Sequence, residues 1–368
     1  MNKKLGQMMI MGVQGTTLSN YEKRFIVENN IGGVILFGRN LQEPKQIYEL
    51  TRQIQSLSAQ QEEKLPLFIG IDMEGGRVHR LKPPFTHWPA LQKIGKMDST
   101  SLSFKFAQCM GRELASIGVN LNFAPCIDVL TNSKNTVIGD RSISSDAEVV
   151  TKHSSALVRG YIKSGIIPCA KHFPGHGNTL VDSHEDLPVE TTTSEALHAR
   201  ELIPFKKAFR ARLDMVMTSH IQFKNIDPDY PVTFSKKFLS EWIRDEFRFR
   251  NIIISDDLDM KALTKYFSRE EIPVKALQAG VDILLYCNEP ESPEIAVDSV
   301  CKALAEDRLN RNGVEESYRR VIKLKKEKLT KLHVPTLEEM VNIIGHPDHM
   351  RLAKAIEAEE LPEDLLVT

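Results

Sequence analysis

The sequence lacks several features that mark membrane, secreted and nucleic-acid-binding proteins. None of its apolar runs reaches the roughly 20 residues that a membrane-spanning helix needs. The apolar stretch near the N-terminus is short and no small-residue cleavage site follows it, so we interpret it as a first strand and not as a signal peptide. The formal net charge is −1, and no face or tail is strongly basic. We therefore expect neither a membrane nor a nucleic acid as a partner.

Cysteine is also scarce. The five cysteines are scattered and lack metal-ligand spacing, and most of them lie in apolar runs, which predicts buried, reduced thiols. Reduced thiols are typical of a reducing compartment, so we expect a cytoplasmic protein. We also expect it to be a monomer. The cysteines are Cys109, Cys126, Cys169, Cys287 and Cys301.

The sequence does contain a regular alternation of short apolar runs and longer amphipathic ones. The short runs are rich in β-branched residues and do not alternate with polar ones, which is typical of parallel strands buried on both faces. Eight strand–helix pairs over roughly 300 residues predict a (β/α)8 TIM barrel of the α/β class. The expected strands are 7–12, 33–37, 67–72, 119–124, 166–170, 215–218, 252–255 and 282–286.

The alternative to a barrel is an open, doubly wound sheet. No G-x-G-x-x-G motif follows the first strand, so the dinucleotide-binding form of that sheet has no support. We assign residues 1–307 to a single catalytic barrel domain. Residues 308–368 form a C-terminal helical tail that either packs beneath the barrel or is partly mobile. Among the helices between the strands we expect one over 194–209, with Ser194 as its N-cap.

Titratable residues are densest in the segment 171–184, directly after the fifth expected strand. The segment holds Lys171, three histidines and Asp182, together with one proline and two glycines. Helices and central strands rarely tolerate so much proline and glycine, so we predict a loop that begins where the strand ends. A polar loop on a rigid strand is a common place for catalytic groups.

Polar residues also follow the other expected strands. Because the active sites of TIM barrels lie at the C-terminal ends of the strands, these residues are expected to meet at one rim. Each of them alone has an ordinary structural explanation, such as a helix cap, but so many at one rim predict an active site. They are Asp72, Asn122, Lys171, His172, Ser219, His220, Asp256, Asp257 and Asn288.

This set of residues suits retaining glycoside hydrolysis, which needs a nucleophilic carboxylate and a proton donor on opposite sides of the scissile bond. Asp256 suits the role of nucleophile because a rigid strand would hold it in place. His184 suits the role of acid and base, since Asp182 can hold its imidazole in one tautomer and stabilise the protonated form. The side chains that would hold sugar hydroxyls are Lys171, Arg80 and Arg141.

Longer motifs, in order along most of the barrel, carry a family resemblance. The motifs are 32–37, 72–80, 122–125 with Asp128 and Val129, 139–142, 171–177, 182–184, and 255–258 with Met260. Together they resemble the β-N-acetylglucosaminidases of glycoside hydrolase family 3, notably the cytoplasmic enzymes of bacterial peptidoglycan recycling. Two positions depart from the family pattern, because Met73 and His79 stand where glutamines are usual.

The resemblance implies an enzyme without metal or cofactor that removes terminal non-reducing β-linked N-acetylglucosamine, with retention, through a covalent glycosyl-enzyme. Its expected partners are carbohydrate substrates, the muropeptides of peptidoglycan. The resemblance implies that Asp256 is the nucleophile and that His184, paired with Asp182, is the acid/base. Arg77 and His176 would shape the neighbouring turn and loop. The implied sugar-binding residues are Asp72, Arg80, Arg141, Lys171 and His172.

Three alternative functions remain open from the residues. A metal-dependent hydrolase could use the three histidines and Asp182 of the segment 171–184, although its i, i+4 histidines lie on a Pro/Gly loop and not on a helix. A β-N-acetylglucosaminide phosphorylase is the second, because a histidine acid/base leaves no anionic carboxylate beside an incoming phosphate. A non-catalytic muropeptide sensor is the third, although the intact Asp256 and His184 favour an enzyme.

Overall fold

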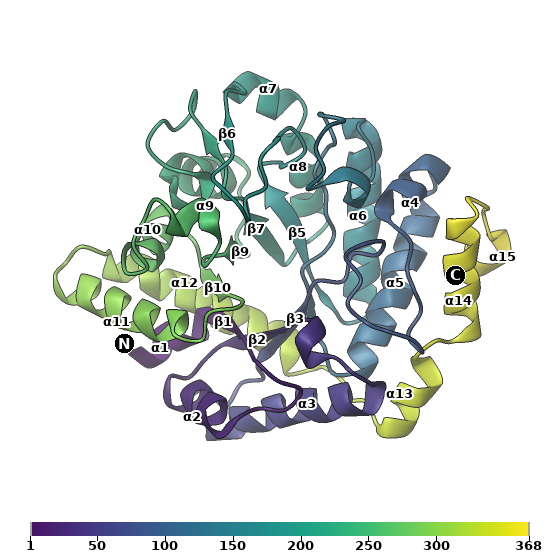
Figure 1. The fold of residues 1–368 in the computed structure, drawn as a ribbon, viewed down its shortest axis with the longest axis horizontal. Helices are drawn as coiled ribbons and strands as arrows, with labels where there is room; N and C mark the ends of the chain where they lie inside the picture. Colours follow the sequence, from purple (N-terminus) through teal and green to yellow (C-terminus); the bar gives the residue numbers. More distant parts are fainter. Residues whose placement is uncertain (1, 367–368) are drawn as a thin grey trace.

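The computed structural model describes residues 2–366. Within that range, eight parallel strands close into a barrel surrounded by helices (Figure 1). Hydrogen-bonded neighbours follow the order β1-β10-β9-β7-β5-β4-β3-β2 around the barrel, so the predicted (β/α)8 barrel is confirmed. The strands are β1 (Met9–Gly12), β2 (Gly33–Leu36), β3 (Phe68–Ile71), β4 (Leu121–Asn122), β5 (Ile167–Phe173), β7 (Met215–Thr218), β9 (Ile252–Asp257) and β10 (Ile283–Tyr286).

Helices connect the barrel strands and make up most of the C-terminal segment. A short parallel pair, β6 (Val189–Glu190) and β8 (Gln222–Phe223), lies outside the barrel. The α- and π-helices are α1 (Asn2–Gln7), α2 (Asn20–Glu28), α3 (Pro44–Ser56), α4 (Leu91–Met97), α5 (Thr100–Ser116), α6 (Ala147–Lys163), α7 (Ser194–Ala199), α8 (Leu202–Arg210), a π-helical segment (Lys237–Glu246), α9 (Lys261–Thr264), α10 (Glu271–Ala279), α11 (Ser292–Ala305), α12 (Arg311–Leu324), a second π-helical segment (Lys325–Leu329), α13 (Leu337–Ile343), α14 (Pro347–Glu357) and α15 (Glu363–Leu366).

The barrel strands carry apolar side chains on both faces, which is why their sequences show no alternation. One face fills the barrel interior, with Ile10, Phe68 and Ile254 among the buried residues there. The other face packs against the surrounding helices. Helix α1 and helix α12 contribute Leu5 and Val321 to the same interior cluster, so they close the barrel at the N-terminal ends of its strands.

The tail has two parts with different places in the fold. The predicted division at residue 307 falls in the connection between α11 and α12. Directly after α12, Lys325 is fully buried, and its Nζ donates to Gln7 Oε1 at 2.7 Å beneath the barrel. Helices α13 and α14 instead pack against α5, on the outside of the barrel (Figure 1). The part of the tail described by the structure is therefore held in place along both stretches.

The prediction of one helix over 194–209 with Ser194 as its N-cap is wrong. The chain forms α7 and α8, with a break at Arg200, whose φ of −139° is not helical. Thr193 caps α7, because its hydroxyl accepts a hydrogen bond from the amide of Ala196 at 3.3 Å. Pro204 explains the break: it has no N–H for the carbonyl of Arg200, but it is tolerated in the first turn of a new helix.

The prediction that the loop begins at Lys171 is also wrong. Strand β5 continues to Phe173, so Lys171 and His172 belong to the strand. In the same way, Asp256 lies within β9, which ends at Asp257. The strands continue through these polar residues because other elements supply buried partners for their side chains at the mouth of the barrel.

Candidate active site

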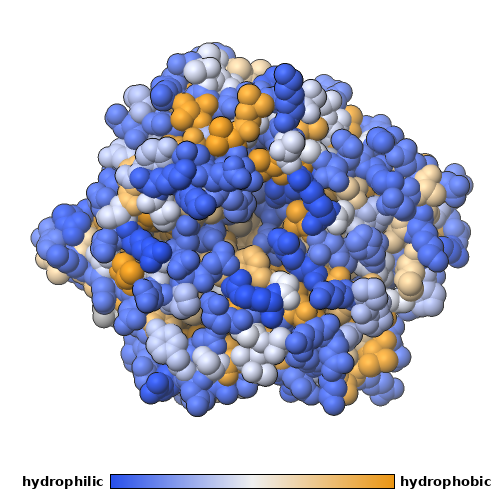
Figure 2. Space-filling view, in the orientation of Figure 1, coloured by the Kyte–Doolittle hydropathy of each residue, from blue (hydrophilic) through white to orange (hydrophobic). Residues whose placement is uncertain are grey.

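One cleft of about 530 Å³ gathers the predicted site residues. It lies at the C-terminal ends of the barrel strands, and Figure 2 shows a hollow near the centre of the molecule bordered mostly by hydrophilic residues. The structure thus brings together side chains that are far apart in the sequence. All eight residues predicted to be catalytic or sugar-binding line this cleft: Asp72, Arg80, Arg141, Lys171, His172, Asp182, His184 and Asp256.

A buried network of opposite charges forms one wall of the cleft. Lys171 Nζ lies 2.6 Å from Asp72 Oδ1 and 2.7 Å from Glu74 Oε1. Arg141 forms two further bonds to the Glu74 carboxylate, at 2.8 and 2.9 Å. Burial would raise the pKa of Glu74, but Arg141 and Lys171 hold it well below its usual range. The network therefore stays ionised and fixes two cations that face the cleft.

Glu74 is a residue with no predicted role, although it lies in the motif that follows β3. It is 1% exposed and balances the charges of Arg141 and Lys171. The sequence did contain a signal for this role, because Glu74 lies two residues after the strand-end Asp72 and directly before Gly75 and Gly76. The turn brings Glu74 back into the barrel mouth through a hydrogen bond from its amide to the carbonyl of Val78 at 2.9 Å.

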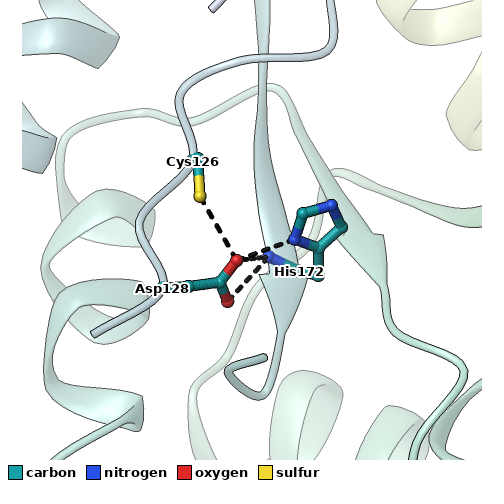
Figure 3. Close-up of side chains that lie close together, drawn as sticks. All are labelled: Cys126, Asp128 and His172. Atoms are coloured by element: carbon teal, nitrogen blue, oxygen red, sulfur yellow. Dashed lines mark hydrogen bonds and ion pairs between the residues drawn. The ribbon is translucent and has the colours of Figure 1, made fainter. Parts of the chain in front are cut away.

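Asp128 is the second residue with no predicted role, and it orients His172. Its carboxylate accepts hydrogen bonds from His172 Nδ1 at 2.7 Å, from the His172 amide and from the His176 amide at 2.8 Å. Cys126 Sγ donates to the same carboxylate at 3.3 Å (Figure 3). Burial would raise the pKa of Asp128, but His172 and the other donors lower it to about 2. With Nδ1 held by Asp128, His172 directs Nε2 toward Arg141, 3.4 Å away.

The three side chains of Figure 3 also bear on the alternative function of a metal-dependent hydrolase. Among residues 2–366, Cys126, Asp128 and His172 form the one group of three or more His, Cys, Asp or Glu side chains whose potential ligand atoms all lie within 4.8 Å of one another. Donors in the protein already occupy the Asp128 carboxylate, and burial raises the pKa of the Cys126 thiol. Of the predicted metal set, His184 pairs with Asp182, but His176 Nδ1 bonds the Thr179 hydroxyl. Within residues 2–366, no three of these four residues bring ligand atoms within 4.8 Å of one another.

Asp256 and Asp257, at the end of β9, have opposite tendencies to ionise. Burial would raise the pKa of Asp256, but His172 and His220 keep it below its ordinary value, and Oδ1 accepts from the Asp257 amide at 2.8 Å. Burial and the neighbouring Asp259 raise the pKa of Asp257 to about 7. Asp256 is therefore the carboxylate suited to act as a nucleophile near neutral pH.

The Asp182–His184 pair also lines the cleft, on an exposed arm. Asp182 Oδ1 accepts from His184 Nδ1 at 2.8 Å and from its amide at 2.9 Å. The side chain of His184 is 72% exposed. The bond to Nδ1 fixes the tautomer and leaves Nε2 for exchange of a proton with a substrate. Ser183, between them, accepts from the amide of Ala262 at 3.2 Å, which joins the arm to α9.

Known proteins similar to this chain identify its family. The model of the glycosyl hydrolase family 3 N-terminal domain matches residues 1–324. The chain belongs to glycosyl hydrolase family 3. A beta-hexosaminidase from Hydrogenovibrio crunogenus is 36% identical over 311 residues, which are 82% of this chain and 84% of that protein. Beta-hexosaminidase A from Pseudoalteromonas piscicida is 34% identical over 361 residues, which are 92% of this chain but 60% of that longer protein.

A solved structure extends the likeness of this family 3 chain to its fold. The family 3 β-N-acetylglucosaminidase from Paenibacillus sp. FPU-7 is 32% identical, with a TM-score of 0.91 over 98% of this chain and 68% of that one. The prediction of a family 3 glycoside hydrolase of the β-N-acetylhexosaminidase type is thereby confirmed. Residues 325–368 lie beyond the family 3 match.

Proposed function

We propose that this family 3 glycoside hydrolase is a retaining exo-β-N-acetylglucosaminidase that releases terminal, non-reducing N-acetylglucosamine from muropeptides. One observation carries the proposal: a single cleft is lined both by Asp256 on a rigid strand and by the Asp182–His184 pair on an exposed arm. A carboxylate that stays ionised and an imidazole with one nitrogen available are the two groups that retaining hydrolysis needs.

The proposed reaction proceeds in two steps. A carboxylate oxygen of Asp256 attacks the anomeric carbon while His184 gives its Nε2 proton to the departing glycosidic oxygen, so the aglycone leaves as an alcohol. His184 then takes a proton from water, whose oxygen attacks the same carbon and releases Asp256 as a carboxylate. Two inversions restore the original configuration. Asp182 stabilises the imidazolium, which exists before the first step and forms again in the second.

The charged wall of the cleft supports sugar recognition. In the proposal, hydroxyl groups of the sugar bind the charged and imidazole groups that the network holds in fixed positions. Ionised groups form hydrogen bonds roughly twice as strong as neutral ones, which suits a polar ligand. The proposed sugar-binding residues are Asp72, Arg80, Arg141, Lys171 and His172.

We also propose that the enzyme works in the cytoplasm as a monomer. Four cysteines are buried thiols, as expected in a reducing compartment. Within residues 2–366, no helix has the length and apolar character to cross a bilayer. The buried thiols are Cys109, Cys126, Cys169 and Cys287.

Incubation with purified muropeptides tests this function. We expect mass analysis to detect free N-acetylglucosamine and NMR to detect its β-anomer first. The α-anomer as first product would refute retention. Turnover of an aryl β-N-acetylglucosaminide without release of sugar from muropeptides would refute the substrate and leave the reaction standing.

Variants and buffer conditions test the residues and the second candidate, a phosphorylase. Asp256→Ala should lose several orders of magnitude in kcat, and Asp298→Ala, which removes an exposed carboxylate from α11, should lose none. Near-full turnover by Asp256→Ala would refute the nucleophile.

Because the acid/base is a histidine, phosphate could approach the glycosyl-enzyme without repulsion from an anionic acid/base. Sugar 1-phosphate as the main product in phosphate buffer would identify a phosphorylase.

A further inference from the structure

A buried carboxylate ties the C-terminal tail to the loop 72–90 that follows β3. Glu113 on α5 is 1% exposed, and its Oε1 accepts hydrogen bonds from His349 Nδ1 at 2.9 Å and from the Gly345 amide at 3.3 Å. The same carboxylate accepts from the Thr86 hydroxyl at 2.6 Å and from the Thr86 amide at 3.1 Å. His349 lies on α14, which runs beside α5 in Figure 1. Glu113 therefore holds the tail and the loop at one point.

Thr86 in turn holds the part of the loop that enters the cleft. Its carbonyl oxygen lies 3.0 Å from His79 Nε2, and Arg80 is the next residue in the chain. A second bond between the two arms of the loop runs from the Gly76 amide to the Trp88 carbonyl at 2.8 Å. Arg80 lines the cleft, and its Nε is buried without a hydrogen-bond partner among residues 2–366. Its placement therefore depends on the backbone that carries it.

The contact between tail and barrel is a pair of opposite charges. Burial would lower the pKa of His349, but hydrogen bonds with Cys109 and Glu113 outweigh burial and raise it to about 9. The imidazolium is thus charged at neutral pH and balances the carboxylate of Glu113. Without His349, this buried carboxylate would keep only neutral donors from Thr86 and Gly345, and a buried charge without a counter-charge is strongly destabilising.

We propose that Glu113 and His349 are positioning residues for the sugar site, because they fix Thr86 and, through it, the loop that presents Arg80 to the substrate. This inference rests on the proposed function, in which Arg80 binds the sugar. It extends the supporting structure of the cleft into the tail, whose residues 325–368 lie outside the family match. The tail thereby contributes to substrate affinity without contacting the substrate.

Steady-state kinetics of full-length variants with an aryl β-N-acetylglucosaminide test the proposal. Thr86→Val keeps the shape of the side chain and loses the hydroxyl, and His349→Ala removes the counter-charge. We expect each to raise KM about fivefold and to change kcat less than about twofold, because a loop placed correctly about a fifth of the time weakens affinity by that factor. His349→Asn keeps an amide donor near the position of Nδ1 but lacks the charge, so it should restore only part of the affinity.

The chain offers a matched control on the same tail. Glu357→Gln weakens an exposed contact between α14 and Lys93, where the carboxylate lies 2.9 Å from Nζ, and does not involve Glu113. We expect it to leave KM unchanged. A rise in KM equal to that of His349→Ala would show a general effect of loosening the tail and would overturn the positioning role.

Coupling to Arg80 distinguishes positioning from loss of stability. In an Arg80→Ala background, Thr86→Val should leave KM unchanged, because the residue that it positions is gone. A rise of about fivefold that persists there overturns the proposal. Hydrogen exchange of the amides of 75–88 requires no substrate, and we expect it to be faster in Thr86→Val and His349→Ala but not in Glu357→Gln. Unchanged exchange refutes this inference, whereas a wild-type enzyme without turnover refutes the proposed function.

Discussion

Replacing Glu74 by glutamine tests the charged network of the cleft quantitatively. The substitution keeps the size of the side chain but removes the charge that balances Arg141 and Lys171. Glu74 is 1% exposed and forms three charge-assisted contacts of 2.7 to 2.9 Å with these cations. Removing one partner from a buried ion pair costs about 3–5 kcal/mol, because the remaining charge stays buried. We expect Glu74→Gln to lower the free energy of unfolding by that amount at pH 7.

Asp72→Asn is the matched control, since it removes the same charge from the same network. Its side chain is 18% exposed, and its one ion pair among residues 2–366 is with Lys171, at 2.6 Å. Water screens this pair in part, so we expect a smaller loss of stability, about 1–2 kcal/mol. With an aryl β-N-acetylglucosaminide, however, Asp72→Asn should lose more kcat/KM than Glu74→Gln, because Asp72 is proposed to bind the sugar directly. A larger loss of stability in Asp72→Asn would refute the reasoning.

The pH dependence of the stability difference between the wild type and Glu74→Gln provides a second check on the role of Glu74. Arg141 and Lys171 hold the folded-state pKa of Glu74 well below the value of about 4.3 that a glutamate has in an unfolded chain. A carboxyl whose pKa falls on folding stabilises the protein above its unfolded pKa, and this stability is lost as the pH decreases. Urea unfolding should therefore show the full difference from Glu74→Gln at pH 7 and a shrinking one below about pH 4. A loss below about 1 kcal/mol at pH 7, or one independent of pH, would refute the network.

Three further predictions concern other parts of the molecule. His184→Ala should slow alkyl glycosides far more than activated aryl glycosides, since acid assistance matters most when the departing oxygen is basic, and equal losses of kcat/KM would exclude the acid role. Asp128→Asn should raise KM about tenfold, through loss of a charged hydrogen bond to His172, and an unchanged KM would contradict this. Burial lowers the pKa of Lys325 to about 7. From there up to about pH 10, this side chain binds fewer protons in the folded state than in the unfolded state, so the folded protein gains stability as the pH rises. Lys325→Met should lack this gain in urea unfolding, and a constant difference from wild type over pH 7–10 would count against it.

The barrel could be predicted because its strands need apolar residues on both faces, and such runs stand out in a sequence. The ends of the strands could not, because polar residues interrupt the pattern while the hydrogen-bonding ladder continues. Lys171 illustrates this: its place in β5 depends on Asp72 and Glu74, which are supplied by another part of the chain. Pro204 was visible in the sequence, but its effect depends on where the helix begins, so the break between α7 and α8 was missed.

The residues of the candidate site also differ in whether they could be predicted from the sequence. The reaction and the sugar demand particular residue types, so Asp256 and His184 could be chosen from the sequence. The groups that orient the proposed sugar-binding residues are defined only by contact, as Glu74 is for Arg141 and Lys171 and Asp128 is for His172. Glu113 is the extreme case, because its partner His349 lies 236 residues away and neither touches the cleft. A relative could therefore keep every residue that contacts the sugar and still differ in affinity, if the carboxylate beneath Thr86 or its counter-charge were exchanged.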